Sequence, residues 1–173
     1  DTGTEPLRVT KGRIELRNVS FHYGTDIQAL RSVDLTIEPG TTVALVGRSG
    51  SGKTTITNLL LRLYDPAEGE ILIDGQDTRS VTLNSLRQQI ALVNQQTILF
   101  NDTVARNIAY GDEQPDMERV REAAHYANAL KFIDALPEGF DTLVGEQGAR
   151  LSGGQRQRLA VARALYKDAP ILV

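Results

Sequence analysis

Apolar residues in the first half of the chain recur mainly at the spacing of strands. Residues 14–21 and 29–37 alternate apolar and polar side chains, which predicts two strands with one buried face each. The uninterrupted apolar run at 41–47 predicts a strand buried on both faces. Further strands are predicted at 69–75, ending in an Asp-Gly turn, and at 90–93.

Helical spacing of the apolar residues dominates the second half. The predicted helices cover residues 54–64, 83–89, 103–110, 116–127, 129–136 and 153–167. Pro170 ends the last of them, and the apolar run from Ile171 predicts the start of a buried strand. A strand-and-helix core that contains an all-helical insertion predicts an α/β fold with a helical subdomain.

Composition excludes several classes of function. The net charge of −3 argues against a non-specific nucleic-acid binder, which would carry a basic field. The chain has no cysteine, so it has no disulfide and no thiolate chemistry, and its two histidines are too few for a multi-histidine zinc site. No apolar run approaches a transmembrane length, and residues 1–13 lack a signal-peptide stretch. We therefore expect this piece to be soluble.

The glycine-rich stretch GRSGSGKTT carries the strongest chemical signal. It fits the pattern G-x-x-x-x-G-K-[ST], in which glycines let the backbone aim successive N–H groups at phosphate oxygens. Lys53 supplies charge for the β- and γ-phosphates, and the Thr54 hydroxyl can ligate Mg²⁺. A plain glycine-rich turn is the alternative, but a predicted strand before the loop and a helix after it favour phosphate binding. The residues predicted to bind nucleotide are Gly47, Arg48, Ser49, Gly50, Ser51, Gly52, Lys53, Thr54 and Thr55.

The stretch LSGGQRQRLAVARAL distinguishes among the many protein classes that share such a loop. Ser152 is a good N-cap, Gln155 stands where a capping box requires it, and Gly153 and Gly154 leave the first helical N–H groups open to an anion. Capping alone could mean only a well-capped helix. The arginines that follow are interpreted as a solvated or salt-bridged helix face rather than a nucleic-acid patch: Arg156, Arg158 and Arg163.

LSGGQ is the signature motif of the ATP-binding-cassette (ABC) family, and the chain resembles that family over nearly its whole length. Gly47 to Thr54 resembles its Walker A motif, and Tyr23 resembles the aromatic residue that stacks on adenine. Gln95, which precedes a second glutamine, resembles the Q-loop residue that touches Mg²⁺ or the attacking water. The stretches around Glu146 and at 99–111 resemble exporters, most closely the bacterial lipid A flippase type.

The resemblance implies a P-loop NTPase (RecA-like) core with an antiparallel β subdomain and an inserted α-helical subdomain, the core sheet being incomplete. It implies a linker from an upstream membrane domain at 1–13, and a β subdomain with the Walker A part of the core at 14–94. The Q-loop, helical subdomain and signature then occupy 95–160, and 161–173 return to the core.

The resemblance also implies ATP and Mg²⁺ as cofactors and a second copy of the domain as partner. Two copies pair head to tail, so that Ser152, Gly153, Gly154 and Gln155 of one copy reach the nucleotide on the Walker A loop of the other. With a fused or associated transmembrane domain, at the cytoplasmic face of the bacterial inner membrane, hydrolysis would drive export of a lipid or another amphipathic substrate. The alternative is a soluble ABC ATPase that acts on DNA or ribosomes.

The apolar run at 171–173 resembles the start of the Walker B strand, whose aspartate and glutamate serve Mg²⁺ and the attacking water. The printed sequence stops before either carboxylate. Gln95 is then its single catalytic candidate, and we expect the 173-residue fragment to bind nucleotide without hydrolysing it.

Overall fold

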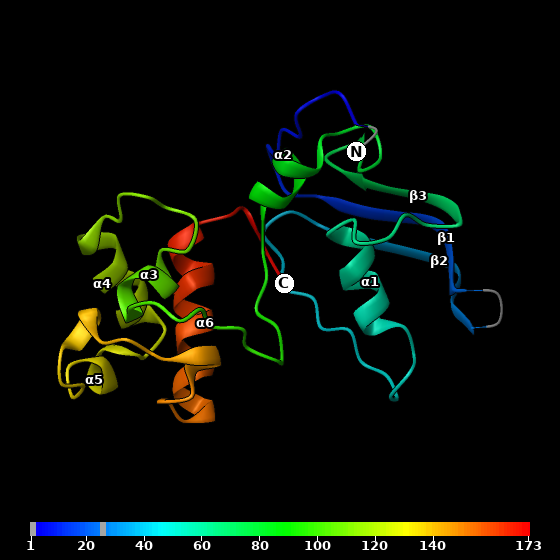
Figure 1. The fold of residues 1–173 in the computed structure, drawn as a ribbon. Coiled ribbons are helices and arrows are strands. Elements are labelled where there is room, and N and C mark those ends of the chain that lie inside the picture. Colours follow the sequence, from blue (N-terminus) through cyan, green and yellow to red (C-terminus); the bar gives the residue numbers. More distant parts are fainter. Residues whose placement is uncertain (1–2, 25–26) are drawn as a thin grey trace. The chain divides into compact units, whose positions relative to one another are not determined.

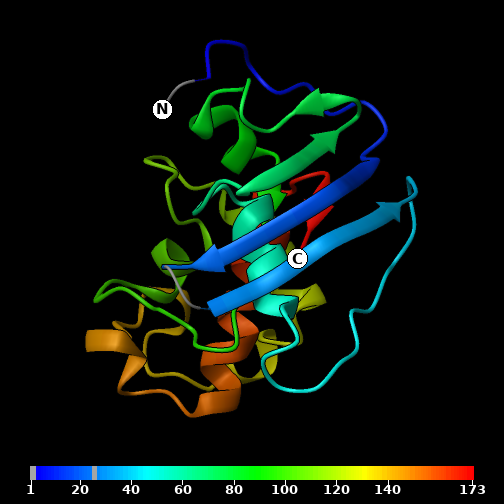
Figure 2. The ribbon, with the colours of Figure 1, turned by 90° about the vertical axis from the view of Figure 1, so that its right-hand side faces the viewer.

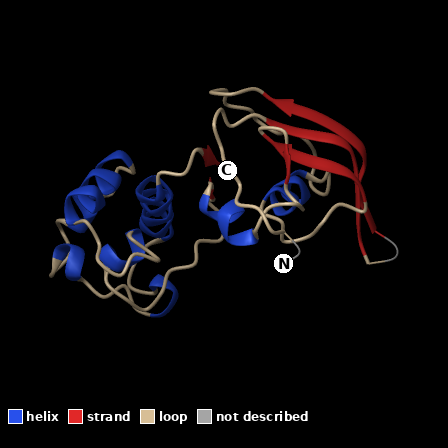
Figure 3. Cartoon of the chain, turned by 90° about the horizontal axis from the view of Figure 1, so that it is seen from above, coloured by secondary structure: helices blue, strands red, loops and turns tan. Residues whose placement is uncertain are grey.

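The computed structural model describes residues 3–24 and 27–173, which pack as two compact units, 1–90 and 91–173 (Figure 1). The strands of the first unit form one sheet, whereas the second unit consists mainly of helices (Figure 3). The expected mixture of α and β structure is therefore confirmed. The domain scheme proposed from the resemblance stays a prediction.

An antiparallel sheet of four strands, in the order β2-β1-β3-β4, forms the first unit. Its strands are β1 (Ile14–Tyr23), β2 (Ile27–Ile37), β3 (Glu68–Ile73) and β4 (Gln76–Asp77). Asp74 and Gly75 join β3 to β4 with positive φ angles of 47° and 78°. A two-residue hairpin turn of this kind needs positive φ at both positions, which explains the Asp-Gly pair. The strands predicted at 14–21, 29–37 and 69–75 are confirmed.

Helix α1 (Lys53–Leu60) lies against this sheet (Figure 2), with Ile56, Leu59 and Leu60 buried. It begins after Gly52, whose φ is 89°. A Cβ on Gly52 would come within 2.5 Å of Leu30 Cδ2 and 2.7 Å of Ala29 O. Only glycine therefore lets the start of α1 approach β2 this closely.

The strand predicted at 41–47 is wrong. These residues form no strand and are exposed, Val46 to 93% and Val43 to 44%. A strand buried on both faces needs hydrogen-bonded neighbours. Within the described residues, the strands outside the antiparallel sheet are β5 (Ile90–Ala91) and β6 (Ile171–Leu172), and these pair with each other. Within the ranges that the structure describes, the apolar run therefore pairs with no strand.

The second unit packs around a core of helices. Its elements are α3 (Val104–Ile108), α4 (Met117–Tyr126), α5 (Leu130–Ile133), the 3₁₀ turns η1 (Gly139–Asp141) and η2 (Glu146–Gly148), and α6 (Gly153–Lys167). Ile108, Val120, Ile133 and Leu159 are fully buried in this core. The helices predicted in this region are confirmed, and so is α2 (Leu83–Gln88) in the first unit. No helix in the described ranges has the length and apolar character that crossing a membrane requires.

The segment before β1 is fastened to the β3–β4 turn. The Asp74 carboxylate accepts hydrogen bonds from the backbone N–H groups of Thr10, Lys11, Gly12 and Arg13, at 2.7 to 3.1 Å. Burial raises the pKa of the Asp74 carboxyl, but these four donors hold that pKa well below its usual range. Further back, Leu7 is buried. The described part of the predicted linker therefore packs on the first unit.

Replacing Asp74 by asparagine should lower the free energy of unfolding by about 1–3 kcal/mol at neutral pH, because an amide oxygen accepts more weakly than a carboxylate. The folded-state pKa lies below the unfolded value of about 3.9, so the stabilisation is present above about pH 4 and disappears at lower pH. Urea denaturation should show a smaller difference in the free energy of unfolding between wild type and Asp74→Asn at pH 3 than at pH 7. Glu68→Gln, which removes an exposed carboxylate of β3, is the matched control, and an equal loss from it would contradict the prediction.

Candidate functional site

The phosphate loop, residues 47–55, folds back on itself around Lys53. The N–H of Ser51 donates to Arg48 O at 3.1 Å, and Gly50 takes a φ of 79°. Lys53 Nζ donates to Gly47 O and to Arg48 O, both at 2.8 Å, and to Ser51 Oγ at 3.2 Å. The ammonium group therefore lies within the turn of the loop, where three neutral oxygens accept its hydrogen bonds.

The residues of this loop fit a phosphate group. A Cβ on Gly47 would come within 2.4 Å of Ser51 Oγ and 3.9 Å of Lys53 Nζ, so a side chain there would fill the turn. Among the described residues, no side chain caps the first N–H groups of α1, which leaves them available to an anion. The exposed Thr54 offers a hydroxyl oxygen, the ligand type that Mg²⁺ prefers. Within the described ranges, no group of three or more metal-ligating His, Asp or Glu side chains lies together.

Tyr23 lies beside the same helix, at the end of β1. Its hydroxyl is 3.4 Å from Thr55 Oγ1 and accepts a hydrogen bond from Asn58 Nδ2 at 3.3 Å. Its ring meets the rings of Phe21 and Tyr64 edge to face, with centroids 4.8 and 5.3 Å apart. The structure thus brings the predicted adenine-stacking residue to the predicted phosphate loop within one unit.

The signature segment begins α6 in the second unit, with the predicted capping box in place. Ser152 Oγ accepts from Gln155 N at 3.3 Å, and Gln155 Oε1 accepts from Ser152 N at 2.8 Å. Ser152, Gly153 and Gly154 are exposed. The first turn of α6 is therefore ordered by its own side chains and open to an approaching group.

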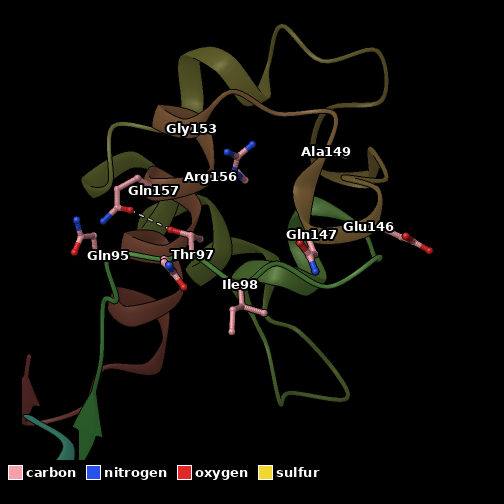
Figure 4. Close-up of a pocket in the computed structure, with 10 residues that line it drawn as sticks. Gln95, Thr97, Ile98, Glu146, Gln147, Ala149, Gly153, Arg156 and Gln157 are labelled. Atoms are coloured by element: carbon pink, nitrogen blue, oxygen red, sulfur yellow. Dashed lines mark hydrogen bonds between the residues drawn. The ribbon is translucent and has the colours of Figure 1, made fainter. Parts of the chain in front are cut away.

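A cavity of about 770 Å³ lies beside this helix (Figure 4). Residues 95–98, the turn that carries Glu146, and Gly153, Arg156 and Gln157 of α6 line it. On one side of it, the Thr97 hydroxyl donates to Gln157 Oε1 at 3.0 Å (Figure 4). The structure therefore gathers the predicted Q-loop residue Gln95, the acidic residue Glu146 and the signature helix around one cavity.

Arg163 bonds to backbone carbonyls within the second unit, which corrects its interpretation as part of a solvated or salt-bridged face, whereas Arg158 is exposed as expected. The half-buried Arg163 donates to Asn107 O at 2.7 Å and Ile98 O at 2.9 Å, and burial lowers its pKa. Arg156 donates to Leu151 O at 2.6 Å, and the exposed Arg158 to Asn128 O at 3.3 Å. Arg163 in particular fixes the loop after Gln95 to α6.

The predicted site residues thus form two groups, the phosphate loop with Tyr23 in the first unit and Gln95 with the signature in the second. Sequence reasoning missed Asn58, Tyr64 and Thr97. The three-residue spacing of Thr55 and Asn58 places both on one helix face and was a usable signal for Asn58.

Comparison with known proteins agrees with these motifs. Residues 30–173 match the family described as ABC transporter. Over 173 residues the chain is 60% identical to the ATP-dependent lipid A-core flippase of Saccharophagus degradans, and over 175 residues it is 56% identical to that of Escherichia coli K12. All of this chain and 30% of each relative are covered. The solved structure of a bacterial Atm1-family ABC exporter with ATP bound matches 97% of this chain and 30% of its own, with a TM-score of 0.94 and 48% identity.

Replacing Arg163 by methionine should lower the free energy of unfolding by about 2–4 kcal/mol, because Ile98 O and Asn107 O lose a charged donor. Hydrogen exchange should also quicken at the backbone amides of residues 98–107. Arg158→Met, on the exposed face of the same helix, is the control and should lower the free energy of unfolding by less than about 1 kcal/mol. Equal losses from both variants in urea denaturation would refute the role assigned to Arg163.

Proposed function

The chain belongs to the ABC transporter family, and from that premise we propose that these residues form the nucleotide-binding domain of an ABC exporter. Its core is a P-loop NTPase (RecA-like) fold with an antiparallel β subdomain and an inserted helical subdomain. The domain couples ATP-dependent head-to-tail dimerisation and ATP hydrolysis to export. Its similarity to an exporter structure over 97% of the chain supports the assignment.

One observation carries the proposal: a single chain contains two glycine-flanked helix N-termini. At α1 the N-cap Gly52 makes no side-chain cap bond, and at α6 Ser152, Gly153 and Gly154 are exposed. Such N-termini are anion sites because their first N–H groups point outward and the helix dipole favours negative charge. The α1 site also holds the Lys53 ammonium. In a head-to-tail pair, α1 of one copy and α6 of the other hold the same nucleotide from opposite sides.

Each side chain then has a defined task. Tyr23 stacks on the base, residues 47–55 hold the phosphates, and Thr54 and Gln95 provide oxygens for Mg²⁺. The metal, when bound, neutralises charge on the phosphates. Gln95 also orients the attacking water, and Ser152 to Gln155 hold the phosphates in trans. Closure and reopening of the pair would move attached membrane domains between two states.

The names of the relatives support a lipid or another amphipathic molecule as the exported substrate. The further partner is a fused or associated transmembrane domain, and the place of action is the cytoplasmic face of the membrane. None of the reported relatives supports the alternative, a soluble ATPase acting on DNA or ribosomes. The net charge of −3 also disfavours nucleic acid as a partner.

In the full-length protein that carries these residues, Lys53→Ala should slow MgATP hydrolysis by about 100-fold or more, because a preorganised charge on the phosphates is lost. Ser152→Ala should abolish ATP-dependent dimerisation. Thr82→Ala is its matched control, since Thr82 caps α2 in the same way at a site outside the proposed nucleotide contact. Gel filtration measures the fraction of dimer with and without MgATP. It is done on variants that cannot hydrolyse MgATP. A dimer that survives Ser152→Ala would contradict the proposed contact of the signature with the nucleotide in trans.

A polypeptide of these 173 residues alone should bind MgATP and release no phosphate, because it contains no residue assigned to the Walker B roles. Calorimetry measures the binding and a phosphate-release assay the turnover, with Lys53→Ala measured in parallel and the intact mass confirmed. Turnover that depends on Lys53 would mean that another residue positions the water, and would contradict this expectation.

A further inference from the structure

The hydroxyl of Tyr23 is tied to the phosphate-loop helix by two polar side chains. Asn58 Nδ2 donates to the hydroxyl oxygen at 3.3 Å, and Thr55 Oγ1 lies 3.4 Å from the same oxygen. Because a phenol is at once a donor and an acceptor, it can accept from Asn58 and donate its hydrogen to Thr55. Thr55 is buried and Asn58 half-buried, so water competes little for these contacts.

The ring of Tyr23 is also enclosed by aromatic contacts. Phe21 and Tyr64 meet it at interplanar angles of 89° and 88°, the edge-to-face geometry that aromatic pairs favour. Rotation of a tyrosine ring about χ2 is otherwise broad and weakly restricted. Two ring neighbours together with a bonded hydroxyl therefore fix both the place and the tilt of the ring.

The contacts of Asn58 and Thr55 with the Tyr23 hydroxyl connect the base end of the proposed nucleotide site to its phosphate end. Asn58 stands five residues after Lys53 on α1, about 7.5 Å along the helix axis at about 1.5 Å per residue. Thr55 and Asn58 share one face of this helix. A single rigid element thus carries the lysine that meets the phosphates and the amide that holds the base platform.

We infer that Asn58 is a positioning residue for the Tyr23 ring and that it sets affinity for the adenine base, leaving phosphate binding unaffected. This rests on the proposed function, since it requires nucleotide on the phosphate loop. The physical effect is preorganisation: a ring already held at its tilt loses little conformational freedom when a base stacks on it.

The test measures binding of MgATP and of magnesium tripolyphosphate, which has the phosphates and no base, to the full-length protein by calorimetry. Asn58→Ala should weaken MgATP by about three- to tenfold, in keeping with the loss of one ordered side chain, and leave tripolyphosphate unchanged. Tyr23→Phe keeps the ring and removes the hydroxyl, so it should weaken MgATP by a similar factor. Because both variants break the same bond, the double variant should be no weaker than either single one.

Thr57→Ala is the matched control, on the same helix and one residue from Asn58. In the described part of the chain, the Thr57 hydroxyl makes no hydrogen bond to Tyr23 and takes no part in the proposed site. Thermal unfolding of each variant confirms that it is folded. Equal weakening of MgATP and tripolyphosphate by Asn58→Ala would mean that the residue only supports the helix, and would overturn the inference. So would unchanged MgATP affinity, or additive effects of the two substitutions. Absence of MgATP binding by the wild type would instead overturn the proposed function itself.

Discussion

A helix leaves the N–H groups of its first turn without partners inside the helix, and the candidate site depends on how this chain meets that constraint. At α6, Ser152 and Gln155 satisfy part of the need with a capping box. At α1, Gly52 brings no capping side chain, and its positive φ turns the backbone so that the donors remain open. Under the proposed function, α1 is therefore the site with the greater need for an anion. The end of α6 is ordered beforehand and completes the site from a second copy.

Three local features of the sequence show how far rules based on neighbouring residues can predict the structure. The capping box at Ser152 and the Asp-Gly hairpin at Asp74 were predictable, because each involves residues a few positions apart. The apolar run at 41–47 misled, because a buried strand is a property of its neighbours as much as of its own residues. The run at 41–47 is mainly apolar, but within the described residues no strand pairs with it. The loop after it nevertheless takes a closed turn, since the Lys53 ammonium bonds to oxygens inside the loop itself.

Contacts between distant segments were not predictable from spacing. Thr10 and Asp74 are 64 residues apart, and Ile98 and Arg163 are 65 apart. In both cases a charged side chain bonds to backbone groups, which carry no residue-specific signal in the sequence. The surface interpretation of Arg163 failed for this reason. Tyr23 was predicted from the family resemblance. Its contacts with Asn58 and Tyr64 depend on how β1 packs against α1 and the residues after it, although helix spacing offered a signal for Asn58.

Contacts between distant segments also bear on how the second unit would work. Arg163 bonds to Ile98 O and Asn107 O, and Thr97 bonds to Gln157, so the segment after Gln95 is fastened to α6 from two sides. The half-buried Arg163 is partly shielded from the water and salt that weaken surface ion pairs. A displacement of the signature helix would therefore carry the Gln95 segment with it. If α6 closes on a nucleotide held by another copy, the segment that directly follows Gln95, the residue proposed to orient the attacking water, moves in the same step.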